Sequence, residues 1–107
     1  MTYKLINGNG NIKDYYYNGK LKFEGEYLNG EKNGKGKEYN YFNNNLIFDG
    51  EYLNGKRNGK GKEYIDEGKL FLEIEYKNGQ KNGKGKVFDL EGRIKYEVEY
   101  INDKKII

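Results

Sequence analysis

The side chains of this chain that could do chemistry are carboxylates and lysines, set in short repeated clusters. Two carboxylate pairs, Glu24/Glu26 and Glu73/Glu75, have the composition of a glycosidase acid–base pair. Such a pair works when its surroundings raise the pKa of one carboxyl above that of the other. Here the carboxylates lie at i and i+2 on the expected solvated side of a strand, with basic neighbours. We therefore expect no acid–base catalysis, and the spacing does not fit a calcium loop either.

The run Gly34-Lys35-Gly36-Lys37 has the glycines and lysines of a phosphate-binding loop. A P-loop, however, needs a Ser or Thr directly after its lysine and a helix behind it. Neither is present in this sequence, so the run is interpreted as part of a β-hairpin.

The residue types that are missing narrow the function further. The chain of 107 residues has no Cys, His, Ser, Ala, Pro or Trp, and Thr2 is its only threonine. This excludes Ser or Cys nucleophiles, a His general base and His/Cys metal sites. We expect a protein that is not an enzyme and has no cofactor and no metal.

Charge and hydropathy indicate the setting. Twenty basic and seventeen acidic residues give a net charge of +3, with the two signs interleaved, which argues against a nucleic-acid partner. No apolar run is long enough to span a membrane, and Met1–Lys4 does not begin a signal peptide. We expect a cytoplasmic protein.

A repeat organises nearly the whole sequence. The block Asn-Gly-x-x-Asn-Gly-Lys-Gly-Lys occurs at Asn29–Lys37, Asn54–Lys62 and Asn78–Lys86. A fixed period of this length indicates repeated supersecondary units that pack on their neighbours. The prediction is one repeat domain over residues 1–107, with units at 20–44, 45–68 and 69–92 and partial units at 1–19 and 93–107.

Each unit carries a segment in which apolar and charged residues alternate, as in a half-buried strand. One side of these segments holds Leu21, Phe23, Gly25 and Tyr27, then Leu46, Phe48, Gly50 and Tyr52, then Leu70, Leu72, Ile74 and Tyr76, then Ile94, Tyr96, Val98 and Tyr100. Helices would not tolerate so many glycines, which cost about 1 kcal/mol each. The predicted fold is all-β: a single-layer, twisted, antiparallel meander of β-hairpins.

The Asn-Gly steps predict where the chain reverses. A loop over Asn29–Gly34 places Tyr27 opposite Gly36, with its ring over the glycine. The same register predicts three exposed ion pairs, Glu26–Lys37, Glu51–Lys62 and Glu75–Lys86. Second reversals are expected at Asn18-Gly19, Asn43-Asn44, Glu67-Gly68 and Glu91-Gly92. Bulges are expected before these reversals, and they leave open the faces of Tyr39, Tyr41, Tyr64 and Phe88.

Eight glycines are assigned a structural role, in the mid-strand positions, the first turns or the Gly-x-Gly steps. They are Gly25, Gly34, Gly36, Gly50, Gly59, Gly61, Gly83 and Gly85.

The segment from Phe48 to Gly61 resembles the MORN repeat, whose pattern is roughly Y-x-G-x-W-x-x-G-x-x-H-G-x-G, in a bacterial variant with a period near 24 residues. Aromatic residues stand at the Trp position (Tyr27, Tyr52 and Tyr76), and asparagines stand at the His position (Asn33, Asn58 and Asn82). The resemblance covers about residues 8–103. Ile74 and Val98 replace the usual glycine, which predicts a less uniform array near the C-terminus.

The resemblance implies a trough-like sheet that acts as an interaction scaffold. Our first hypothesis is a protein-interaction module that binds a protein partner through the trough or the edge strands, with contacts from Tyr27, Tyr52, Tyr76, Tyr100 and Val98. The alternative is a peripheral module that binds anionic phospholipid through basic hairpin loops, with Lys32, Lys56, Arg57 and Lys81 projecting in a row at one edge of the sheet.

The two ends of a meander are unpaired edge strands. The N-terminal edge is expected at Tyr3–Ile6 and the C-terminal edge at Ile94–Ile101. The last unit shows no return strand, so we expect a weak homodimer through the C-terminal edge. Val98→Lys is expected to favour the monomer.

Overall fold

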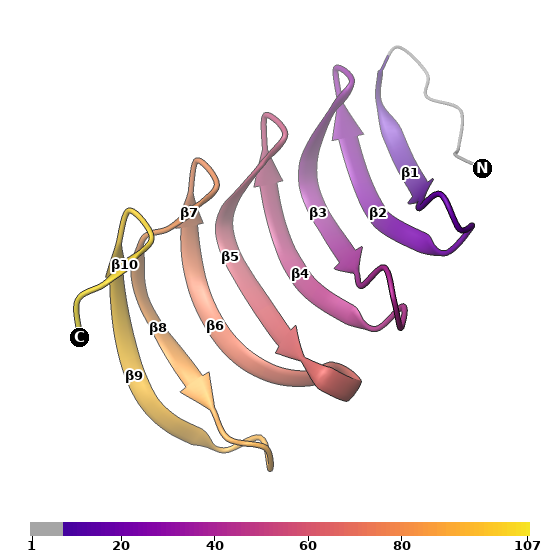
Figure 1. Cartoon of the computed structure of the whole chain (residues 1–107). Coiled ribbons are helices and arrows are strands. Elements are labelled where there is room, and N and C mark those ends of the chain that lie inside the picture. Colours follow the sequence, from indigo (N-terminus) through magenta and orange to yellow (C-terminus); the bar gives the residue numbers. More distant parts are fainter. Residues whose placement is uncertain (1–7) are drawn as a thin grey trace.

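The protein folds into one open antiparallel sheet in the computed structural model, which describes residues 8–107 (Figure 1). Its strands are β1 (Gly10–Tyr15), β2 (Leu21–Leu28), β3 (Glu31–Tyr39), β4 (Leu46–Leu53), β5 (Lys56–Ile65), β6 (Lys69–Lys77), β7 (Gln80–Lys81), β8 (Gly83–Phe88), β9 (Ile94–Ile101) and β10 (Lys104–Lys105). A single 3-10 turn, η1 (Asp66–Gly68), joins β5 to β6. The order in the sheet is β1-β2-β3-β4-β5-β6-β8-β9-β10, with β7 also on β6.

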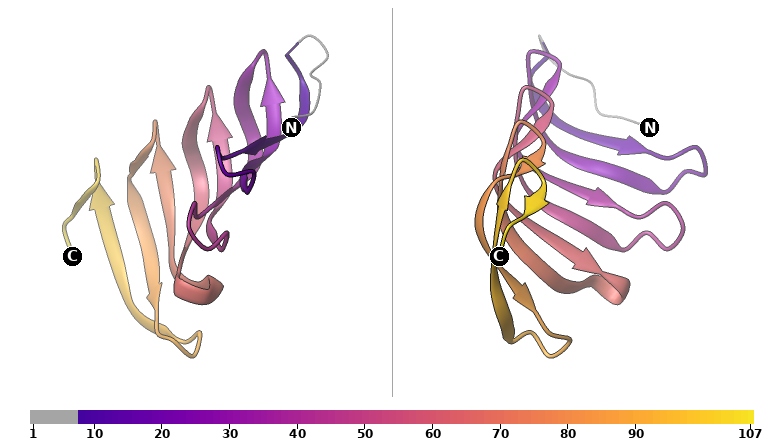
Figure 2. Two further views of the ribbon diagram at one scale, coloured as in Figure 1. Left: turned by 45° about the vertical axis from the view of Figure 1, so that its right-hand side comes forward. Right: turned by 60° about the vertical axis from the view of Figure 1, so that its left-hand side comes forward.

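The predicted meander is therefore confirmed, since neighbours in the sheet follow the chain and every pair is antiparallel. Figure 2 shows a single layer whose strands rotate progressively from one end to the other, as twisted sheets do. The expected N-terminal edge at Tyr3–Ile6 lies outside the described residues.

The hairpin turns are shorter than the sequence suggested. Asn29 and Gly30 have φ values of 52° and 80°, and Asn54 and Gly55 have 51° and 84°. Two positive φ values in succession indicate a two-residue type I′ turn, which matches the twist of the flanking strands. The predicted loop over Asn29–Gly34 is wrong, because Glu31 already pairs with Leu28.

The remaining residues of that predicted loop form a bulge inside β3. Tyr27 pairs with Lys32 and Gly25 pairs with Gly36, so three residues of β3 oppose a single residue of β2. The side chain of that one residue, Glu26, accepts the N–H of Lys35 at 3.2 Å and so replaces a missing ladder hydrogen bond.

The same bulge recurs in β5, where Glu51 accepts the N–H of Lys60 at 3.0 Å. The bulge shifts the register, so the predicted ion pairs are wrong. The residues that face each other are Glu24 and Lys37, Asp49 and Lys62, and Glu73 and Lys86.

The predicted second reversals and their bulges are confirmed. Gly19, Asn44, Glu67 and Gly92 have positive φ values. The register shifts just before these turns, at Asp14/Tyr15, Glu38/Tyr39, Glu63/Tyr64 and Val87/Phe88.

The core lies on one face of the sheet, which we call the aromatic face. Its buried residues are Phe23, Phe48, Tyr52, Leu72, Ile74, Tyr76, Val87 and Val98. Rings of successive units meet edge to face: Phe23 lies 5.4 Å from Tyr52, and Phe48 lies 5.5 Å from Tyr76 between ring centroids. Each unit thus packs its phenylalanine on the tyrosine of the next unit, which makes the core continuous along the array.

These rings lie directly over glycines. A Cβ atom at Gly36 would lie 2.6 Å from the Phe23 ring and 2.9 Å from the Tyr52 ring. The predicted ring over Gly36 therefore exists, but it does not belong to Tyr27. The bulge moves Tyr27 toward the hairpin turn, and Phe23 with the tyrosine of the next unit takes its place.

The C-terminal half reaches the same packing with other residues. Leu72 stands where Phe23 and Phe48 stand in their units, and it is 1% exposed. The volume lost with the ring is replaced by Ile74 and Val98, both at positions where earlier units have glycine. The predicted departure from a uniform array near the C-terminus is therefore a compensated change within the core.

Backbone and asparagine hydrogen bonds tie each hairpin turn to the preceding unit. Gly55 donates to the carbonyl of Lys32 at 2.9 Å, and Gly79 donates to the carbonyl of Arg57 at 2.8 Å. The amide oxygen of Asn58 accepts the N–H of Asn78 at 3.0 Å. Each turn is thus fixed by the unit before it, as expected where single units cannot fold alone.

The C-terminal edge differs from its prediction. A short return strand exists, since β10 pairs Lys104 with Ile101 and Lys105 with Tyr100. Ile106 and Ile107 continue it through hydrogen bonds with Glu99. Among the described residues, the strand partner of β9 on this side reaches back only to Glu99, which leaves the segment from Ile94 to Val98 open.

Substitutions of glycine test the ring packing. A Cβ atom at Gly61 would lie 2.7 Å from the Phe48 ring and 2.9 Å from the Tyr76 ring. We expect Gly61→Val to lower the free energy of unfolding by about 3 kcal/mol. At Gly55 a Cβ atom would meet only the carboxylate of Glu31, at 3.9 Å, so the left-handed backbone alone opposes Gly55→Ala and about 1 kcal/mol is expected. Thermal and urea melts measure both; equal losses would exclude ring packing as the dominant constraint.

The segment of β9 without a strand partner predicts weak self-association, because an unpaired edge strand can pair with a second copy of the chain. Val98 is 3% exposed and belongs to the core, so Ile94, 56% exposed, is the better position to test. We expect sedimentation velocity to show a concentration-dependent shift that Ile94→Lys reduces. Leu90→Lys, at a turn residue 61% exposed, should leave the shift unchanged. A concentration-independent monomer would contradict this prediction.

Candidate functional site

The aromatic face is closed over by a cluster of charged and hydroxyl side chains. The guanidinium of Arg57 lies 3.8 Å above the ring of Phe48. It donates two hydrogen bonds to Glu38, from Nε at 3.1 Å and from Nη2 at 2.9 Å. The hydroxyl of Tyr52 donates a short hydrogen bond to the same carboxylate. This arrangement satisfies all three polar groups above a ring that is fully buried.

The cluster recurs along the array. Tyr76 donates to Glu63, and the ammonium of Lys81 lies 3.6 Å from the same carboxylate. Four cations occupy equivalent positions and lie over rings: Lys32 over Phe23, Arg57 over Phe48, Lys81 over Tyr100 and Lys105 over Tyr96.

This column of cations corrects the predicted basic row. Lys32, Arg57 and Lys81 do not project at an edge of the sheet; they point onto the aromatic face, and only Lys56 is exposed. The reason is the two-residue turn. It makes Lys32 the partner of Tyr27 and Arg57 the partner of Tyr52, and directly paired residues share a face.

The directions of the pKa shifts follow from burial and from the hydrogen bonds of the cluster. Burial would raise the pKa of Glu38, but hydrogen bonds from Arg57 and Tyr52 outweigh it and hold that pKa below its usual value. Burial and the hydrogen bond to Glu38 raise the pKa of Tyr52, and Tyr76 is raised likewise by burial and Glu63. The carboxylate stays charged and the phenols stay neutral near pH 7.

The five side chains predicted to contact a partner belong largely to this core. Tyr52 and Tyr76 are 5% exposed and Val98 is 3% exposed, whereas Tyr27 and Tyr100 are half-buried. Partner contact through them stays a prediction, and the accessible surface of the sheet lies elsewhere.

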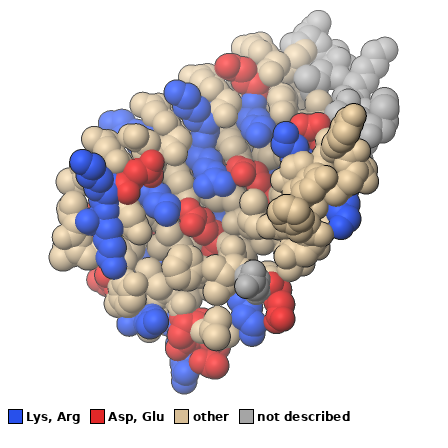
Figure 3. Space-filling view, in the orientation of Figure 1, with Lys and Arg blue, Asp and Glu red and all other residues tan. Residues whose placement is uncertain are grey.

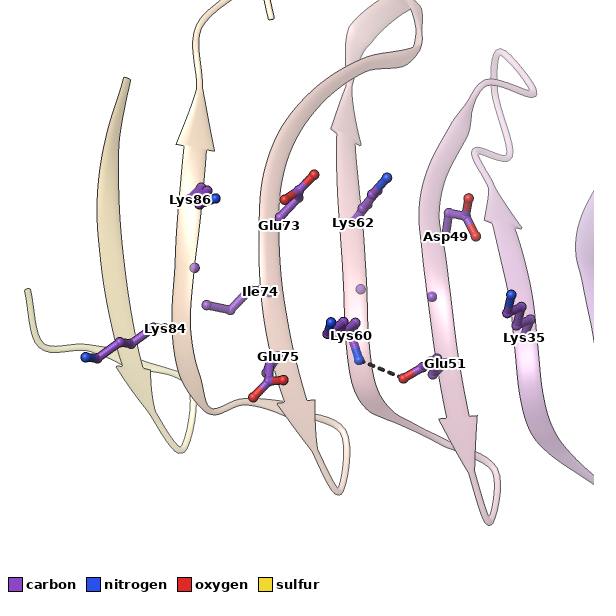
Figure 4. A pocket seen from close by; sticks show the side chains of 13 residues that line it. Lys35, Asp49, Glu51, Lys60, Lys62, Glu73, Ile74, Glu75, Lys84 and Lys86 are labelled. Atoms are coloured by element: carbon purple, nitrogen blue, oxygen red, sulfur yellow. Dashed lines mark hydrogen bonds between the residues drawn. The ribbon is translucent and has the colours of Figure 1, made fainter. Parts of the chain in front are cut away.

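The opposite face carries a charged groove with a volume of about 700 Å³. We use this name for the hollow lined by Lys35, Asp49, Gly50, Glu51, Lys60, Gly61, Lys62, Glu73, Ile74, Glu75, Lys84, Gly85 and Lys86. Figure 4 shows its charged side chains in two rows, one on each side of a central line of glycines and Ile74.

The sign of the charge changes from each strand to the next. β4 and β6 contribute carboxylates, whereas β3, β5 and β8 contribute lysines. The pairing Lys37–Asp49–Lys62–Glu73–Lys86 continues this alternation across five strands. The space-filling view in Figure 3 looks onto the other face of the sheet, where the basic and acidic side chains of the cluster above the aromatic rings follow one another.

The groove lysines have no ionic partner within the described part of the chain. Ion pairs within 4.0 Å among residues 8–107 involve only Arg57, Lys81 and Arg93 as cations. Five lysines line the groove, namely Lys35, Lys60, Lys62, Lys84 and Lys86, and Lys37 lies beside it on β3. Their ammonium groups face solvent above a floor of backbone, which leaves them available to a ligand.

Two tyrosines that the sequence could not place lie on this face. Tyr39 donates a hydrogen bond to Glu24 at 2.6 Å, and burial together with that bond raises its pKa. Tyr64 has its pKa raised by burial and by the charges of Asp49 and Glu73. Both rings follow a bulge, and they add apolar surface beside the rows of charge.

Alternation along the strands predicts only a solvated face for the groove residues and does not reveal the site. The signal was present in the order of the residues. Each unit places an acid-x-acid segment on one strand, as in Glu73-Ile74-Glu75, and Lys-Gly-Lys on the next, as in Lys60-Gly61-Lys62. Correct strand register was needed to see that these segments lie side by side.

Acid tests the charged cluster on the aromatic face. The folded-state pKa of Glu38 is lowered, so its stabilisation is present above the unfolded value of about 4.3 and is lost as the pH falls through the folded pKa. We expect Glu38→Gln to lower the free energy of unfolding by about 1–3 kcal/mol at pH 7, and by much less at pH 3.

Glu91→Gln is the matched control, because Glu91 pairs with Arg93 in solvent, with side chains 67% and 73% exposed. Its effect should stay below about 1 kcal/mol at either pH. Urea melts at both values measure the four differences. A loss for Glu38→Gln that does not depend on pH would contradict a role for its charge.

Comparison with known families agrees with this architecture. The MORN repeat family model matches three segments, residues 23–40, 48–69 and 75–87. They coincide with hairpin β2–β3, hairpin β4–β5 with its following turn, and the paired ends of β6 to β8. No curated protein matches the sequence. The hairpin repeats, their glycines and these three matches together show that the chain belongs to the MORN repeat family.

Proposed function

We propose that this protein is a non-enzymatic interaction module that binds a protein partner in the charged groove. MORN repeats are generally modules for interaction with proteins or membranes, and the family is not catalytic. The observation that carries the proposal is a hollow of about 700 Å³ lined by charges of both signs. Its lysines have no ionic partner among residues 8–107.

Such a surface suits recognition. Charged groups that alternate in sign favour one arrangement of a complementary partner and penalise shifted ones, because like charges then meet. The floor of the groove is rigid, since it is the backbone of paired strands. A partner would therefore meet preformed binding groups.

The phospholipid alternative has less support from the geometry. Of the four residues predicted to bind phospholipid, three lie over aromatic rings, and Lys56 alone is exposed. An anionic membrane also presents a continuous negative surface, whereas the groove interrupts its lysines with carboxylates. No helix within residues 8–107 is long and apolar enough to cross a membrane.

A charge reversal in the groove tests the proposal. The protein is immobilised and exposed to a lysate of the cells that make it. We expect a retained partner that is lost with Lys60→Glu/Lys62→Glu. Lys56→Glu/Lys104→Glu, which makes the same charge change outside the groove, should retain it. Equal retention by both variants, or none by the parent, would overturn the proposal.

Vesicle flotation decides the alternative. Vesicles with and without an anionic phospholipid are centrifuged with the protein in low salt. We expect little flotation with either composition. Strong flotation that needs the anionic lipid and falls with Lys56→Glu/Lys104→Glu would favour the membrane instead.

A further inference from the structure

We infer that the groove binds an extended acidic peptide segment whose carboxylates recur every third residue. This inference rests on the proposed function, because it names the chemistry of the partner in the same groove. It follows from how the lysines are spaced along and across the strands.

Along the strands, the lysines form three pairs. Lys35 and Lys37 flank Gly36, Lys60 and Lys62 flank Gly61, and Lys84 and Lys86 flank Gly85. The two members of a pair are on the same face, about 6.7 Å apart along the strand. The residue between them faces the aromatic side of the sheet, because side chains alternate along a strand, so a carboxylate above it can approach both ammonium groups. Figure 4 shows the pair of β5 and the pair of β8 pointing out of the sheet on either side of this line.

Across the sheet, the lysine pairs recur at every second strand. β3, β5 and β8 are each separated by one strand, β4 or β6. At about 4.8 Å per strand the pairs lie about 9.6 Å apart. Three residues of polyproline II span about 9.3 Å and complete one turn, so residues i and i+3 point to the same side, whereas in a β-extended chain they would point to opposite sides. Carboxylates at every third residue therefore meet successive lysine pairs.

The intervening strands select against a continuous anion. Asp49 and Glu51 lie between the first and second lysine pairs, and Glu73 and Glu75 lie between the second and third. A carboxylate or phosphate placed above these strands is repelled. A run of adjacent acidic residues is attracted by the groove lysines but repelled by the groove carboxylates. Neutral or basic residues between the acidic residues of the ligand avoid that repulsion.

The size of the groove favours an extended segment over a helix. Its lining residues come from five adjacent strands, which span about 19 Å at about 4.8 Å per step. A volume of about 700 Å³ over that length gives a mean cross-section of about 36 Å². An α-helix with side chains is about 10–12 Å wide, which is a cross-section of about 80–110 Å², and this exceeds the cross-section of the groove. About six residues of extended chain cover the length.

Two capped peptides of identical composition test the inference. In the spaced peptide, three aspartates are each separated by two residues of glycine or serine. In the block peptide the three aspartates are adjacent. By fluorescence anisotropy at low ionic strength we expect the spaced peptide to bind about tenfold more tightly, because it reaches three lysine pairs instead of one. Added salt should weaken its binding.

Variants locate the binding site. Lys60→Gln/Lys62→Gln removes the central pair and should weaken the spaced peptide about fivefold, with little effect on the block peptide, which can use another pair. The matched control Lys56→Gln/Lys104→Gln changes the net charge equally outside the groove and should leave both affinities unchanged. Melting curves of the two variants verify that both are folded.

The outcomes separate this inference from the proposed function. Equal affinity for the two peptides, or equal loss in both variants, overturns the inference. In a competition experiment, anionic vesicles and unlabelled spaced peptide each displace the bound spaced peptide. If the vesicles do so at a lower concentration of negative charge, the inference is also overturned, because the groove then prefers a continuous anion. If the lysate partner still depends on Lys60 and Lys62 in that case, the proposed function stands and only the chemistry of its partner is wrong.

Discussion

The packing of aromatic rings over glycine is the interaction on which the rest of this structure depends. A single-layer sheet has no second layer against which it can bury side chains, so its core must form from side chains that pack on one another over one face of the sheet. Phe23 and Phe48 achieve this by lying flat enough for glycines of adjacent strands to fit beneath them, and both are at most 1% exposed. Edge-to-face contacts with the tyrosine of the next unit add about 0.5–1.5 kcal/mol each beyond the buried area. Stability is thereby shared between neighbours, and no hairpin is independent.

The open side of those rings explains where the other charges go. Without a covering layer, ring faces would meet water, and the cations Lys32, Arg57 and Lys81 lie over them instead. Cation–ring contacts of this kind contribute about 0.5–2 kcal/mol, depending on desolvation. Glu38 and Glu63 then neutralise the two cations nearest the centre. The aromatic face thus holds one basic residue of each of these units, whereas the lysines of the Lys-Gly-Lys segments lie on the opposite face.

The sequence was sufficient for the fold but not for the site, and the difference has a single cause. Alternation from Leu21 to Tyr27 and its copies predicts strands, and the repeated Asn-Gly steps predict reversals. Neither pattern says how much of Asn29–Gly34 is turn and how much is bulge. Because side chains alternate in a strand, that uncertainty decides which face Lys32 and Arg57 occupy. The longer loop predicted from the sequence puts these cations at an edge and pairs Glu26 with Lys37. The two-residue turn with a bulge at Gly34 reverses both conclusions.

Comparison among the units of the chain shows that the groove is more constant than the core. Between the second and third units Phe48 becomes Leu72 and Gly50 becomes Ile74, and Glu63 gives way to Val87 at the equivalent position. Over the same units the acid-x-acid and Lys-Gly-Lys segments keep their charge and spacing. Glu51 has a structural role, because it accepts the N–H of Lys60 at the bulge, whereas the exposed lysines of the Lys-Gly-Lys segments can change with little effect on stability. The proposed ligand, which would span several units and meet the same charges in each, offers a reason for these lysines to stay fixed while the core beneath them is rebuilt.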